Sequence, residues 1–135
     1  MDERNSGAAV TGLVVGALVA LGFAILISLL PAWVVLETKW RVVTYIVVAL
    51  AAPPTVWFLQ AVARWRHLDQ RETFIWGAAG AMTFDGLAIG FLPGLYGQTG
   101  QALAWVASAL IFAFASLIVA GQLMLGRAEA VSSPN

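Results

Sequence analysis

One acidic residue, Asp85, lies in an apolar stretch long enough to cross a membrane. Between Phe74 and Pro93 it is the only charged side chain. Placing a carboxylate near the bilayer centre costs roughly 2.5–3.5 kcal/mol on insertion scales, so such residues generally face the interior of a helix bundle. Asp85 is therefore the first candidate for chemistry, as a binder of a proton, a cation or a polar group.

Three hydroxyl side chains complete the candidate proton or polar-ligand site around this acid, and they are Thr83, Thr55 and Ser108. A protonated carboxyl group donates one hydrogen bond, whereas an ionised one only accepts. Burial away from water favours the uncharged form of a carboxyl group. A neutral Asp85 is thus expected to donate to an acceptor on a neighbouring segment.

The pair Pro53-Pro54 supplies such acceptors, because proline has no amide hydrogen. The carbonyls of Ala49 and Leu50 lose their helical donors, and a helix kink is predicted at this point. In lipid the freed carbonyls need another partner. Two interpretations of Asp85 stay open. It is either a hydrogen-bond clamp against these carbonyls or a binding site for a proton, cation or polar substrate.

These residues must be positioned by membrane-spanning helices. The chain has 135 residues, of which 61% are hydrophobic and 10% charged, against soluble averages of about 45–50% and 25%. A span needs about 20 apolar residues. Four stretches qualify, at 8–30, 42–63, 73–92 and 102–125, and they predict a single all-α membrane domain over residues 1–135. Its expected architecture is an antiparallel up-down four-helix bundle.

The basic residues predict the orientation of this bundle, since Lys and Arg favour cytoplasmic segments. With both termini in the cytoplasm, five of the seven basic residues lie inside and only Lys39 and Arg41 lie outside. Aromatic rings prefer the headgroup level. We accordingly expect Tyr96 and Trp105 to bracket the second outer loop at the membrane surface.

Small residues repeat at four-residue spacing in two predicted spans, as Gly12 and Gly16 in the first and Gly86 and Gly90 in the third. Such stripes allow two helices to approach closely in lipid. We interpret all four as helix-packing positions. Whether they pack within one chain or between two chains stays open.

The residue pattern predicts neither a metal site nor an enzyme active site. Without cysteine and with a single histidine, His67, the chain offers no thiolate or multi-histidine metal site. No nucleophile–base pair, phosphate-binding loop or metalloprotease motif occurs, so neither an enzyme nor a cofactor is expected. The charge-dense segment 64–72 is interpreted as an orientation signal, with a site for anionic lipid headgroups as the alternative.

The segment from Phe84 to Pro93 resembles a family of short, uncharacterised bacterial four-helix membrane proteins. That family has an intramembrane Asp, then a small residue, then Phe-x-Pro, and the matching positions here are Asp85, Gly86, Phe91 and Pro93. The Pro-Gly that precedes the Asp in the family is replaced here by Ala81-Met82. The resemblance implies a bacterial inner-membrane protein and no particular activity.

Chain length and helix count are also similar to those of the small multidrug-resistance exporters. Those proteins use one membrane-embedded acid per protomer, a glutamate on the first helix. The first predicted helix of this chain has no acid within its span, so the similarity is architectural.

We therefore expect a small polytopic membrane protein with a packing or accessory role, in which Asp85 is a buried hydrogen-bonding residue. The alternative is a small proton- or cation-coupled transporter with Asp85 as the coupling site. The expected partner is the lipid bilayer, with a homodimer or a larger membrane complex left open. No nucleic acid is expected as a partner.

Overall fold

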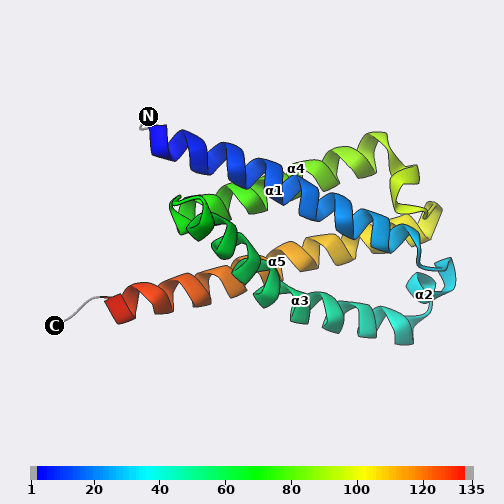
Figure 1. Ribbon diagram of the computed structural model, residues 1–135. Coiled ribbons are helices and arrows are strands. Elements are labelled where there is room, and N and C mark those ends of the chain that lie inside the picture. Colours follow the sequence, from blue (N-terminus) through cyan, green and yellow to red (C-terminus); the bar gives the residue numbers. More distant parts are fainter. Residues whose placement is uncertain (1–2, 133–135) are drawn as a thin grey trace.

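The computed structural model describes residues 3–132, with side chains over residues 6–126, and this part of the chain is helical without any strand. The elements are α1 (Glu3–Ser28), α2 (Ala32–Leu36), α3 (Thr38–Trp65), α4 (Gln70–Phe91), the 3-10 turn η1 (Pro93–Tyr96) and α5 (Gly100–Ser132). Long helices alternate in direction, so the start of α1 and the end of α5 lie at the same end of the molecule (Figure 1). We call this the loop end, because it also holds the α3–α4 loop, and the opposite end the α2 end.

Four of these helices are long and apolar enough to cross a membrane. The apolar segments are Ser6–Ser28, Thr38–Trp65, Gln70–Phe91 and Gly100–Gly126. Large apolar side chains cover the outside of the bundle; Leu50 is 70% exposed and Ile111 72% exposed. A soluble protein rarely exposes apolar surface on this scale. Lipid is the solvent in which this exterior is stable, so the chain is a multi-pass membrane protein by composition.

The spanning helices form two pairs that are not consecutive in the sequence. Helix α1 packs along α4, helix α3 packs along α5, and contact between α1 and α3 is sparse (Figure 1). Glycines make the α1–α4 contact close. A Cβ atom added to Gly12 would lie 2.7 Å from the carbonyl oxygen of Thr73, and one added to Gly16 would overlap the carbonyl of Gly77. Close backbone approach lets dispersion hold helices together in lipid.

Two small apolar clusters lie at different ends of the bundle. One joins Val56, Leu59, Phe74, Ala78 and Leu117 toward the loop end. The Phe74 ring packs where Gly121 of α5 leaves space, since a Cβ there would overlap the ring. The other cluster, toward the α2 end, includes Tyr96 of the η1 turn.

Several helices extend beyond the predicted apolar spans into polar ends, whereas α1 stops at Ser28 and α4 at Phe91, short of the predicted ends at 30 and 92. Helix α4 begins at Gln70, three residues before the predicted boundary at Thr73. The cause is Asp69, whose carboxylate accepts a hydrogen bond of 2.7 Å from the backbone amide of Glu72. An acidic N-cap with Glu at the third helical position stabilises a helix start.

Helix α3 ends in a hydrogen-bonded C-cap with an unusual residue. The amide of Leu68 donates to the carbonyl of Ala63 at 2.9 Å, and the amide of His67 donates to that of Arg64 at 3.2 Å. His67 adopts a φ of 54°, a left-handed conformation that glycine usually supplies at this position of the motif. The charge-dense loop is therefore an ordered turn that fixes where α4 begins.

Helix α3 bends about midway along its length (Figure 1). Pro53 and Pro54 lie within the helix at this level. Proline removes a backbone hydrogen bond and clashes with the preceding turn, which is the usual cause of a sharp bend.

Candidate functional site: the cavity beside Asp85

Asp85 is buried within the bundle, and only 5% of its surface is exposed. It lies six residues before the end of α4 at Phe91, or about 9 Å along the helix axis. Its Oδ1 atom accepts a hydrogen bond of 2.6 Å from the hydroxyl of Tyr96. Short bonds of this kind, from a hydroxyl to a carboxyl oxygen, are among the stronger hydrogen bonds in proteins.

Tyr96 is a candidate site residue that the sequence analysis did not identify. It was expected at the membrane surface beside the second outer loop, whereas it is completely buried, at 0% exposure. The η1 turn folds back against the bundle and places the ring among Ala24, Ala88 and Val106. Burial, and the neighbouring Asp85 as hydrogen-bond partner and charge, raise the pKa of Tyr96 above its ordinary value. Tyr96 therefore keeps its proton and acts as the donor.

Two neighbours of Tyr96 hold the turn in this inward position. Gly97 has a φ of 64°, and a Cβ atom there would lie 2.8 Å from the carbonyl oxygen of Ser28, so only glycine fits. Gln98 is 3% exposed, and its Nε2 donates to the carbonyl of Leu30 at 2.8 Å. These contacts tie the turn to the end of α1 and so place the tyrosine hydroxyl at Asp85.

The hydrogen bond expected between Asp85 and the α3 kink is not formed among the described residues. Pro53 and Pro54 lie on an exposed face of α3, and residues four apart share a helix face. The freed carbonyls of Ala49 and Leu50 consequently lie on the proline side of the helix. Ala49 and Pro53 line a separate groove between α3 and α5, whereas Asp85 takes its hydrogen bond from Tyr96.

The three hydroxyl residues of the predicted site do not form one cluster. Thr55 lines the same cavity as Asp85, but its hydroxyl donates to the carbonyl of Ala51 at 2.8 Å. Ser108 shares a hydrogen bond of 2.8 Å with Tyr45 on α3. Thr83 is exposed on the outer face of α4. Of the predicted polar set, only Thr55 and Asp85 line the same cavity.

The predicted glycine positions also separate into two classes. Gly12 and Gly16 lie in the α1–α4 contact, as described above. Gly86 and Gly90 are exposed, and a Cβ atom at either would meet nothing within 4 Å. The seam within the chain uses Gly77 and Gly80 on α4, one to two turns before Asp85.

A cavity of about 470 Å³ lies between the two helix pairs, and Asp85 is in its wall. All four spanning helices contribute side chains, including Phe23 of α1, Val47 of α3 and Leu110 of α5. The lining is almost entirely apolar. Phe23 and Val47 line the cavity and remain exposed, and contact between α1 and α3 is sparse, so the cavity is not closed off between these two helices.

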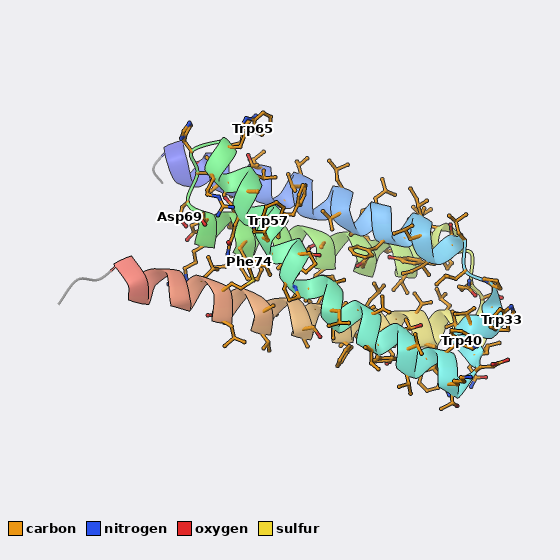
Figure 2. The ribbon with its side chains drawn as sticks, turned by 60° about the horizontal axis from the view of Figure 1, so that its bottom comes forward. Trp33, Trp40, Trp57, Trp65, Asp69 and Phe74 are labelled. Carbon is orange, nitrogen blue, oxygen red and sulfur yellow. The ribbon has the colours of Figure 1, made fainter. Side chains whose placement is uncertain are left out.

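The α2 end of the cavity has a different chemical character. Arg41 lines the cavity there, with its guanidinium carbon 3.9 Å from the centre of the Trp105 ring. Its Nη2 donates to the hydroxyl of Thr38 at 2.7 Å. Trp40 also lines the cavity and packs edge-on against Trp33, with ring centres 5.9 Å apart (Figure 2). This end thus combines a cation with three indole rings.

The described residues offer no set of ligands for a metal ion. No group of three His, Cys, Asp or Glu side chains lies together among the described residues. The arrangement around Asp85 can accept or donate hydrogen bonds and can enclose an apolar molecule.

Comparisons with protein-family models, curated proteins and solved structures found no match to this chain.

Proposed function

We propose that this membrane protein holds one amphiphilic molecule in the cavity between its two helix pairs. The observation that supports the proposal is the cavity itself, about 470 Å³ in volume and lined by all four spanning helices. Protein interiors are normally packed to crystal density. The walls of this cavity are almost entirely apolar and it is open on one side, so in a bilayer an apolar group is its natural occupant.

Access to the cavity fits a ligand that comes from the bilayer. Its open side lies between the apolar surfaces of α1 and α3, at the level of the hydrocarbon core. An acyl chain can enter there without crossing water. A packing or accessory role explains the Asp85–Tyr96 bond and the glycine seam, but it does not explain a cavity lined by every spanning helix. In our proposal, Asp85 is a buried hydrogen-bonding residue in the cavity wall.

The orientation and location belong to the same proposal. The excess of arginine at the loop end supports a cytoplasmic position for both termini, by the positive-inside rule. The α2 end then faces away from the cytoplasm. Resemblance of the Asp85 segment to a bacterial four-helix family supports an inner-membrane location.

Filling the cavity tests the proposal. Ala109 and Ala113 of α5 both line it, and the double variant A109L/A113L adds bulk to the space that the ligand would occupy. We expect native mass spectrometry of the detergent-purified protein to show one bound amphiphile in the parent and none in the variant. Because overpacking destabilises some proteins by about 1–3 kcal/mol, circular dichroism must first show a folded variant.

The control is A104L, since Ala104 lies on the same helix but is exposed. This variant is expected to retain the ligand. Equal retention by both variants, or a parent protein that carries no amphiphile, would contradict the proposal.

A proton- or cation-coupled transporter is the second candidate, and one observation favours it. Asp85 lines the cavity, and among the described residues only Tyr96 bonds to it, through Oδ1. The second carboxyl oxygen is thus left for a cation or a proton. In this case D85N should abolish the dissipation of a pH gradient by tetraphenylphosphonium in proteoliposomes while leaving the fold intact. Unchanged flux in D85N would exclude Asp85 as a coupling residue.

A further inference from the structure

The α2 end of the cavity has an unneutralised positive charge. Arg41 and Lys39 are two residues apart in the sequence. The acidic residue closest to them in the sequence, Glu37, is exposed. Among the described residues neither cation is seen in an ion pair with Glu37, and Arg41 donates to the Thr38 hydroxyl. Arg41 is instead stacked on Trp105. Its charge is therefore available to a ligand.

The geometry of Arg41 suits an anionic oxygen group. A guanidinium presents five N–H donors in a planar fork that matches phosphate and carboxylate. One nitrogen, Nη2, donates to the Thr38 hydroxyl, and the guanidinium carbon lies over the Trp105 ring, so two contacts restrain the side chain. Stacked and hydrogen-bonded in this way, the side chain loses less conformational freedom when it binds an anion.

The rest of the cavity indicates which kind of group must be attached to the anion. From Arg41 the lining continues along α3 as far as Leu59, a helical distance of about 27 Å. Beyond Arg41 the lining is almost entirely apolar and contains no second Lys or Arg, so an anionic group finds a cationic partner only at the Arg41 end. An amphiphile with its anionic head at Arg41 and its apolar tail along α3 satisfies both ends.

Resting on the proposed function, we infer that the cavity selects a phospholipid with a net negative charge, that Arg41 binds its phosphate, and that one of its two acyl chains occupies the cavity while the other stays in the bilayer. The indole rings of Trp40 and Trp105 lie beside the head, at the depth where such rings interact well with lipid headgroups. Arg41 also makes this end of the cavity unfavourable for a cationic headgroup. The charge distribution thus favours an anionic over a cationic ligand.

Lipid exchange with matched chains tests this assignment. Purified protein is offered phosphatidylglycerol and phosphatidylcholine with identical acyl chains, and bound lipid is quantified by native mass spectrometry. Phosphatidylglycerol is expected to bind preferentially to the parent. A hydrogen bond to a charged group contributes about 1.5–3 kcal/mol, so R41Q is expected to reduce this preference about tenfold or more while still binding phosphatidylcholine.

Matched variants and ligands separate the outcomes. R66Q removes an exposed arginine at the loop end and should keep the preference, while A109L/A113L should lose both lipids. An oleate arm and an inorganic phosphate arm test whether a carboxylate head, or phosphate without a tail, suffices; displacement of bound lipid by either would overturn the phospholipid assignment. An unchanged preference in R41Q overturns the headgroup assignment alone. If the parent binds neither lipid, the proposed function itself is contradicted.

Discussion

Gly16→Ala is expected to destabilise the protein, whereas Gly86→Ala is expected to stabilise it, although both replace a mid-helix glycine. A methyl group on Gly16 would overlap the carbonyl of Gly77, which is backbone and does not move without displacing α4. We expect a loss of at least about 2–3 kcal/mol in the free energy of unfolding. At Gly86 nothing lies within 4 Å, so the higher helix propensity of alanine should add about 0.5–1 kcal/mol.

Unfolding of both variants in mixed detergent micelles, followed by tryptophan fluorescence, measures these changes. The two substitutions are expected to change the free energy of unfolding in opposite directions. A general effect of replacing glycine would instead lower the free energy of unfolding of both variants. If Gly86→Ala proves as harmful as Gly16→Ala, the outer face of α4 is packed against another chain under those conditions. A neutral Gly16→Ala would show that the α1–α4 seam is looser than described.

Tyr96→Phe is expected to reduce the free energy of unfolding by about 1–3 kcal/mol, because it leaves a buried carboxyl without its donor. The ring still fills its place among Ala24, Ala88 and Val106, so the change isolates the 2.6 Å bond to Asp85. Asp85→Asn retains a carbonyl oxygen that accepts from Tyr96 and removes the charge. Its stability is expected to match or exceed that of the parent.

A double-mutant cycle with D85L and Y96F measures how strongly the two side chains depend on each other. The expected result is that Y96F costs much less in the D85L background, where the carboxyl group is already gone. Equal costs of Y96F in both backgrounds would mean that the hydrogen bond contributes nothing to stability. Thermal unfolding in one detergent at fixed pH is sufficient for all four proteins.

The sequence predicts the spanning helices well, because a continuous apolar run long enough to cross the bilayer satisfies its backbone hydrogen bonds there as a helix. Their ends are less predictable, since the cap formed by Asp69 and Glu72 extends α4 beyond its apolar part. The glycines illustrate a different limit. Gly16 and Gly86 have the same local pattern, and only the partner surface separates a packed position from an exposed one.

The sequence predicted Asp85 and Thr55 as site residues, but not the residue that bonds to Asp85. Asp85 is conspicuous because a charge in an apolar run is costly. Its partner, Tyr96, lies eleven residues away, in a turn whose sequence is typical of a surface loop. The inward fold of that turn depends on Gly97 fitting against Ser28, a contact between distant segments. The cavity is harder still to predict, because it arises where α1 and α3 make little contact.

The order in which the helices pair has a consequence for biosynthesis. Helix α1 finds its main partner only when α4 has been made, and α3 only when α5 has been made. A nascent chain that has released its first two spanning helices into the bilayer therefore has no completed hairpin, and its Gly12–Gly16 surface faces lipid. Insertion and assembly are separate stages for such a chain, and a ribosome stalled before α4 leaves a product without its glycine seam.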